Sequence, residues 1–213
     1  MPFKFVRWFT LLVATSAFGY DASDRQLNPS SLSQRLANIQ TVSGQFSQQL
    51  FDPQGVEIDS YGGSFALAKT AKLLWQIESP TAQQIVSNGS LLWIYDPDLE
   101  QVVIETVGDK IELTPMALFN QNSDQIEAQY RVVESSTDTD TIEYHLTAKD
   151  QSALFKIMAI RFVDDAPVSI SLIDRFDQTT DVEFTDLDVN LPLEDSIFEF
   201  SIPDGIDVIR NDR

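Results

Sequence analysis

The sequence of 213 residues contains 33 acidic and 14 basic residues, which gives a net charge of −19 at pH 7. This charge excludes nucleic-acid binding, because phosphate recognition requires a basic surface, and it favours a soluble monomer. The sequence contains no cysteine, which excludes disulfides, thiolate metal ligands, a catalytic thiol and the cysteine that carries a lipoprotein anchor.

Residues 1–19 have the pattern of a cleaved secretory signal. Lys4 and Arg7 form a positive amino-terminal region, an apolar run follows, and Ala17 and Gly19 are the small residues that a signal peptidase reads. An uncleaved anchor is the alternative, but the apolar run is shorter than the roughly 20 residues that span a bilayer. We therefore expect cleavage after Gly19 and release of residues 20–213 into the periplasm as a single domain.

A short helix is predicted near the start of this domain. Residues 28–31, Asn-Pro-Ser-Ser, are typical of a helix start. Leu32, Leu36 and Ile39 follow at i, i+4 and i+7, which places them on one apolar stripe. We expect the helix to end near Ile39 or Gln40.

After this helix the hydrophobic period changes to two, which indicates strands. Leu73, Trp75 and Ile77 share one face of such a strand, and residues 87–90, Ser-Asn-Gly-Ser, predict a hairpin turn. Further strands are predicted at residues 64–69, 85–86, 91–95, 99–105, 128–133, 141–147, 155–163, 169–174, 179–188 and 197–200.

A second helix is predicted where Thr114 and Pro115 interrupt the strands, since Thr is a good N-cap and Pro a good first helical residue. The sequence thus predicts two or three helices and about ten consecutive strands with short turns. This pattern predicts a mainly β fold, an antiparallel meander that curls into a barrel or half-barrel with helices over its apolar face.

Catalytic and metal-binding patterns are missing from the sequence. His145 is the single histidine, its strand period places it toward solvent with Glu143 and Thr147, and no Gly-x-Ser-x-Gly elbow accompanies it. The acidic stretch that begins at Asp186 fails as a calcium loop, because Leu191 stands where such a loop requires Gly. We therefore expect no enzyme activity, no metal and no cofactor.

The many large apolar residues allow two interpretations, an ordinary core or an apolar cavity. Lys69 favours a cavity, because it lies in register with Phe65 and Leu67 on the inward face. A cation on that face requires either a polar partner or a position at the solvent-exposed opening of a cavity. Met116 and Phe119 on the second helix favour a movable apolar cover, since Met suits irregular apolar surfaces.

Residues 87–97, Ser-Asn-Gly-Ser-Leu-Leu-Trp-Ile-Tyr-Asp-Pro, resemble the Asp-Gly-x-x-Leu-Trp-x-Tyr-x-Pro hairpin of the LolA family of periplasmic lipoprotein carriers. Residues 42–49 resemble its first strand, 72–75 (Lys-Leu-Leu-Trp) its Leu-Phe-x-Trp segment, 114–119 the start of its lid helix, and 196–208 its Phe-x-Phe-x-Pro-x-Gly-Val pattern. The similarity extends from about Leu32 to Val208.

The resemblance implies an unclosed, strongly curved antiparallel β half-barrel with a helical lid over an apolar cavity. It implies a carrier that takes acylated lipoproteins from the inner-membrane transporter LolCDE and delivers them to the outer-membrane receptor LolB. The family's lid-latching arginine corresponds to Lys69, which lacks the planar guanidinium fork. We expect the lipid-binding cavity to be lined by Phe46, Phe65, Leu67, Leu73, Trp75, Ile77, Trp93, Tyr95, Met116 and Phe119.

Two other functions remain open at this point. A periplasmic lipid or glycolipid carrier of similar half-barrel fold would carry the same apolar pattern, and its extracted cargo would distinguish it. A periplasmic hydrolase would require a catalytic constellation that the sequence does not contain.

Overall fold

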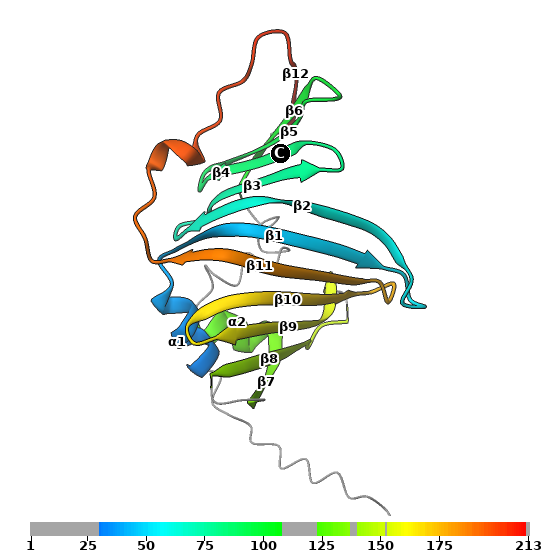
Figure 1. The fold of residues 1–213 in the computed structure, drawn as a ribbon, viewed down its shortest axis with the longest axis vertical. Coiled ribbons are helices and arrows are strands. Elements are labelled where there is room, and N and C mark those ends of the chain that lie inside the picture. The colour runs from blue at the N-terminus through cyan, green and yellow to red at the C-terminus, as the bar shows by residue number, and fades with distance from the viewer. Residues whose placement is uncertain (1–29, 108–122, 137–139, 152, 212–213) are drawn as a thin grey trace, which may run out of the picture.

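The computed structural model describes residues 30–107, 123–136, 140–151 and 153–211. Twelve strands form one sheet in this part of the chain (Figure 1), accompanied by the helices α1 (Ser30–Asn38) and α2 (Ser123–Gln129). The strands are β1 (Thr41–Phe51), β2 (Glu57–Ala68), β3 (Lys72–Ser79), β4 (Gln83–Asn88), β5 (Leu91–Asp96), β6 (Gln101–Thr106), β7 (Tyr130–Ser136), β8 (Thr141–Ala148), β9 (Phe155–Val163), β10 (Ala166–Asp174), β11 (Thr179–Val189) and β12 (Asp207–Asn211).

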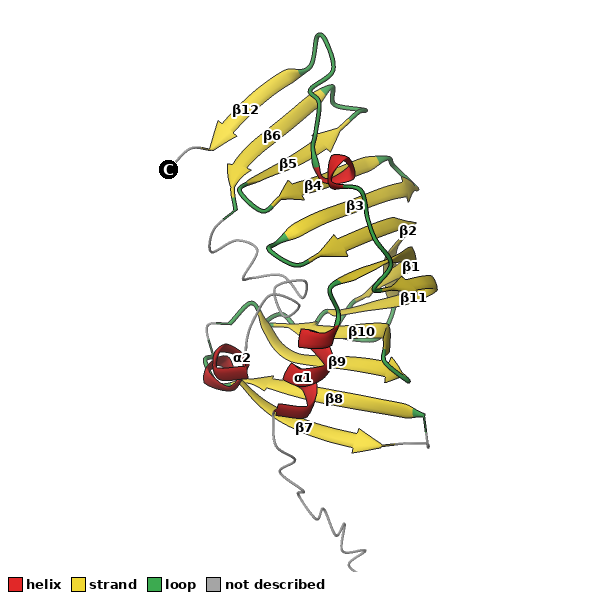
Figure 2. Ribbon diagram, turned by 90° about the vertical axis from the view of Figure 1, so that its left-hand side faces the viewer, coloured by secondary structure: helices red, strands yellow, loops and turns green. Residues whose placement is uncertain are grey.

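The sheet is curved and open, which confirms the predicted half-barrel (Figure 2). Its strand order is β12-β6-β5-β4-β3-β2-β1-β11-β10-β9-β8-β7, so β12 and β7 are the two edges. Neighbouring strands are antiparallel except for β12, which pairs with β6 in parallel. The sheet is not one continuous meander, because β1 pairs with both β2 and β11 and joins two shorter meanders.

Two predicted details near the C-terminus are wrong. Residues 197–200 were expected to form a strand, but Asp195–Phe198 form a 3-10 helix, η3, in which the ring of Phe198 is buried. The prediction also missed β12, in which every residue is exposed, because an exposed edge strand carries only a weak alternation of apolar and polar residues.

The inner face of the sheet is the face on which α1 and α2 pack. The predicted helix at residues 28–40 is confirmed as α1, and its stripe residues Leu32, Leu36 and Ile39 are buried. Ile126 of α2 joins the same core cluster, which extends over the inner side chains of β1–β3 and β7–β11. Both helices lie over β7 to β10, whereas β3–β6 and β12 extend beyond them (Figure 2).

A second, smaller core lies on the outer face of β3–β6. Val86, Trp93, Val102 and Ile104 are buried there, and the C-terminal segment covers them with side chains that include Phe200. The sheet therefore has apolar residues on both faces in this half. No helix within the described residues is long and apolar enough to cross a membrane.

Candidate ligand-binding site

Four aromatic rings form the centre of the inner face. Trp75 stacks on Phe46 with ring centroids 4.0 Å apart, and Phe65 contacts Trp75 at 5.7 Å and Phe184 at 4.9 Å. All four side chains are at most 9% exposed. The prediction identified Phe46, Phe65 and Trp75 but missed Phe184, since only the long-range pairing of β1 with β11 brings Phe184 opposite Phe46.

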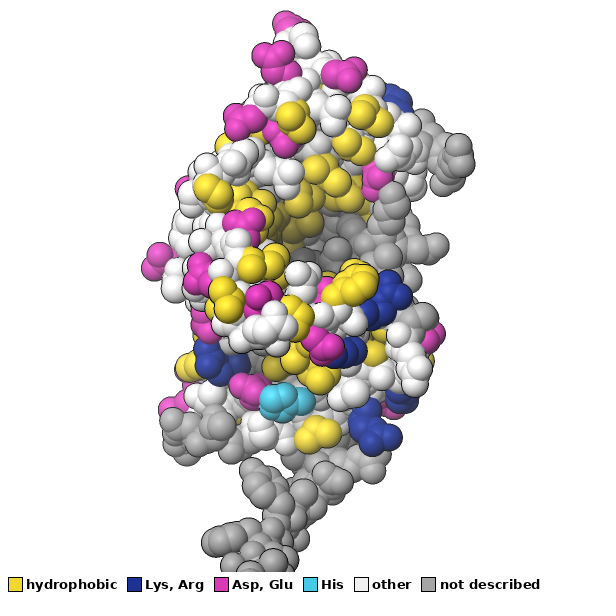
Figure 3. Space-filling model, turned by 90° about the vertical axis from the view of Figure 1, so that its right-hand side faces the viewer, with side chains coloured by type: hydrophobic (Ala, Val, Ile, Leu, Met, Phe, Trp, Pro, Cys, Tyr) yellow, Lys and Arg dark blue, Asp and Glu magenta, His cyan; other side chains and the backbone are white. Residues whose placement is uncertain are grey.

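An apolar row runs from this aromatic centre across the open half of the sheet. Cross-strand pairs place one side chain of each of six strands in this row. The first residue of the row, Phe65, is 4% exposed, and the last, Ile209, is 37% exposed. Figure 3 shows hydrophobic side chains gathered in and around a hollow in the middle of the molecule. The row consists of Phe65, Trp75, Ile85, Ile94, Val103 and Ile209.

Predicted cavity residues also occupy the positions beside this row. Leu67 pairs with Leu73 across β2 and β3, and Leu73 and Ile77 are half-buried against the main core cluster. Farther along the same flank, Glu105 is 9% exposed and accepts a hydrogen bond from Asn211 Nδ2 at 2.8 Å. The inner face of β3–β6 is thus apolar along its middle and partly polar along this flank.

The register separates Trp93 and Tyr95 from the other predicted cavity residues. Trp93 pairs with Val86 and Ile104, and Tyr95 pairs with Val102, so both belong to the outer core. The rings of both residues contact Phe200 of the C-terminal segment, at centroid distances of 6.5 and 5.4 Å. They do not share a face with Trp75, whereas Ile94 between them lies on the inner face of β5.

Lys69 lies on the inner face at the end of β2, where the strand period placed it. Its Nζ donates a hydrogen bond of 2.9 Å to the carbonyl oxygen of Leu36 in the last turn of α1. Burial lowers the pKa of this ammonium group below its ordinary value. The contact joins α1 to the sheet at a helix C-terminus, where the backbone carbonyls favour a cation.

The turn after Lys69 has a left-handed backbone that does not admit proline. Thr70 and Ala71 both have positive φ angles, 67° and 59°, whereas a proline ring fixes φ near −65°. The predicted lid residues Met116 and Phe119 lie outside the described residues.

The described part of the chain contains no group of three or more His, Asp or Glu residues that could hold a metal ion. His145 lies on the outer face with its side chain 46% exposed, where its Nε2 is 2.7 Å from Glu143 Oε1. Its outward position agrees with the prediction from the strand period.

The family pattern and the similar sequences that match this chain point to the same family. The sequence pattern of the outer membrane lipoprotein carrier protein LolA matches residues 37–201. An outer-membrane lipoprotein carrier protein of Hahella chejuensis is 33% identical over 180 residues, which cover 84% of this chain and 86% of the relative. One of Chromohalobacter salexigens is 31% identical over 204 residues, which cover 96% and 97%.

A solved structure agrees with the fold alone. The crystal structure of an uncharacterized conserved protein from Thermus thermophilus matches with a TM-score of 0.54 and 12% sequence identity. The match covers 86% of this chain and 97% of that chain.

Proposed function

The chain belongs to the LolA family of outer-membrane lipoprotein carrier proteins, and we propose that it carries lipoproteins through the periplasm. In this proposal it receives acylated lipoproteins from the inner-membrane transporter LolCDE and delivers them to the outer-membrane receptor LolB. The carrier has no catalytic step. Its cargo requires only an apolar surface that can be occupied and vacated.

The apolar row on the inner face is the observation that carries this proposal. Six strands contribute to it, and neighbouring strands lie about 4.8 Å apart, so the row spans about 24 Å before curvature. One acyl chain in a bilayer spans about half of the roughly 30 Å hydrocarbon core. The row is therefore long enough to cover an acyl chain.

The energetics require a carrier with such a surface. Burial of each methylene is worth about 0.8 kcal/mol, so one long acyl chain is stabilised by on the order of 10 kcal/mol when it leaves water. Delivery then requires a receptor that binds the acyl chains with similar or higher affinity, because the difference in affinity between carrier and receptor sets how the cargo is divided between them.

Depletion of the protein in its native host tests the proposed function. We expect outer-membrane lipoproteins to accumulate in the inner membrane, as fractionation and immunoblotting would show. The protein recovered from the periplasmic fraction of undepleted cells is expected to begin at Tyr20, because residues 1–19 carry the export signal. Normal sorting after depletion contradicts the carrier function, and a periplasmic protein that begins at Met1 contradicts the cleavage.

Lys69 is proposed to latch α1 to the sheet in the empty carrier. A hydrogen bond from a charged donor is worth about 1.5–3 kcal/mol, so its loss in Lys69→Leu should favour the open, loaded form. We expect transfer of bound lipoprotein to purified LolB to become slower by about tenfold or more, since about 1.4 kcal/mol corresponds to a factor of ten.

The matched control is Lys72→Leu. Lys72 is the next lysine along the chain, and its Nζ pairs with Asp195 at 2.7 Å instead of contacting α1. Equal transfer rates for the two variants would contradict the proposed role of Lys69 as a latch.

A further inference from the structure

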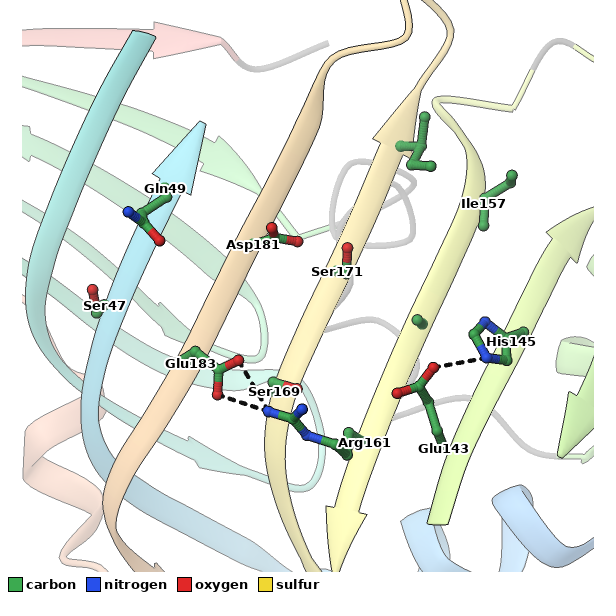
Figure 4. Close-up of a pocket in the computed structure, with 12 residues that line it drawn as sticks. Ser47, Gln49, Glu143, His145, Ile157, Arg161, Ser169, Ser171, Asp181 and Glu183 are labelled. Atoms are coloured by element: carbon green, nitrogen blue, oxygen red, sulfur yellow. Dashed lines mark hydrogen bonds and ion pairs between the residues drawn. The ribbon is translucent and has the colours of Figure 1, made fainter. Parts of the chain in front are cut away.

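A pocket of about 480 Å³ lies on the outer face of β1 and β8–β11 (Figure 4). It is on the opposite face of the sheet from the aromatic centre and the apolar row. Its floor consists of small side chains, since Ser171 and Ala159 pair across β10 and β9 in the middle of the pocket. Asp181 and His145 occupy the two strands that flank this pair.

One wall of the pocket is charged, and most of its charges are paired. Arg161 Nη2 contacts both carboxylate oxygens of Glu183, at 3.0 and 3.1 Å, and His145 contacts Glu143. Asp181 differs from these residues, because its carboxylate has no hydrogen bond or ion pair to any described residue. Figure 4 shows Asp181 beside Ser171 in the pocket.

The opposite wall is apolar. Ile173 and Ile157 pair across β10 and β9, one row along the strands from Ser171 and Ala159. Ile157 is 37% exposed, so part of its side chain is available for contact. The pocket therefore presents an aliphatic wall along one side of its floor of small residues, and the carboxylate of Asp181 next to Ser171 at the β11 end of that floor.

We propose that this pocket binds a lysine or arginine side chain of a protein partner. Such side chains have an aliphatic stem and a charged end, and they bury the stem along apolar surface while the charge meets a polar group. Ile157 and Ile173 provide the surface for the stem, and Asp181 provides the counter-charge. The net charge of −19 also attracts a basic partner, which raises the rate of encounter.

This inference goes beyond the carrier function, because the pocket and the apolar row lie on opposite faces. A partner anchored in the pocket would leave the inner face free for cargo. Docking of a partner and loading of cargo are therefore separable by mutation.

Amide NMR of the full chain, with a peptide probe, tests the proposal. The probe is acetyl-Ala-Arg-Ala-amide, and its reference is the same peptide with citrulline, which has the shape of arginine without the charge. We expect the arginine peptide to shift the amide signals of Ala159 and Ser171 saturably, and the citrulline peptide to bind at least fivefold more weakly. The Asp181→Asn variant should weaken the arginine peptide to a similar extent.

Asp188→Asn is the matched control, because Asp188 is an exposed acid on the same strand outside the pocket. This variant should bind the arginine peptide like the wild type. Equal affinity for the two peptides, or equal effects of the two variants, overturns the proposal. Shifts spread over the acidic surface without the Ala159 and Ser171 signals also overturn it, since they would show unspecific attraction to the net charge.

Discussion

The Leu73→Glu variant is expected to fold and to take up no lipoprotein. Leu73 lies on the inner face beside Trp75, half-buried against the main core cluster. A carboxylate at this position must lose its water when acyl chains cover the inner face, which costs several kcal/mol without a partner. This cost is a large fraction of the roughly 10 kcal/mol that burial of one acyl chain supplies.

The empty variant should remain folded, because Leu73 is only half-buried and a glutamate there can turn toward water. We expect a melting temperature near that of the wild type and no release of lipoprotein from inner-membrane spheroplasts. Gln76→Glu is the matched control, since it adds the same charge to the same strand at an exposed outer-face position. Loss of the cooperative melting transition would show that Leu73 is an ordinary core residue. Normal release of lipoprotein would show that Leu73 does not line the cavity.

The sequence predicts much of the inner face because the period of a strand is two. Phe65 and Leu67 on β2, and Leu73 and Trp75 on β3, were expected on the same side, and the register of these strands places them there. The position of Lys69 follows from the same alternation. These predictions depend only on side chains a few residues apart.

The sequence does not predict which face a strand presents when both faces are apolar. Residues 91–95 read Leu-Leu-Trp-Ile-Tyr, so their alternation does not distinguish inner from outer side chains. Only the pairing of Trp93 with Val86 assigns Trp93 to the outer core. The inclusion of Trp93 and Tyr95 among the cavity residues was therefore wrong about their face.

The remaining differences depend on contacts between distant parts of the chain. Phe184 joins the aromatic centre through the pairing of β1 with β11, and Ile209 extends the apolar row through the pairing of β12 with β6. Both pairings connect residues more than 100 positions apart, which no local pattern reveals. The pocket at Asp181 was missed because it depends on four strand pairings together, three between the consecutive strands β8 to β11 and one between the distant strands β1 and β11.

Trp93→Ala should strongly destabilise the protein without removing its capacity for acyl chains. Trp93 is 7% exposed, packs with Val86 and Ile104, and contacts the ring of Phe200 in the C-terminal segment. Truncation of a buried tryptophan to alanine typically costs about 3–5 kcal/mol, because the lost contacts leave a cavity.

We expect urea unfolding of Trp93→Ala to show a loss of this size, with fluorescent fatty-acid binding to the folded protein unchanged. Leu99→Ala is the control, since Leu99 is 68% exposed and its truncation should change stability by less than about 0.5 kcal/mol. The two measurements then distinguish the two faces of β5, because a substitution at Ile94 should reduce fatty-acid binding, whereas one at Trp93 should reduce stability. If Trp93→Ala kept a stability near that of the wild type and lost fatty-acid binding, Trp93 would line the cavity, and the assignment of the two faces would be contradicted.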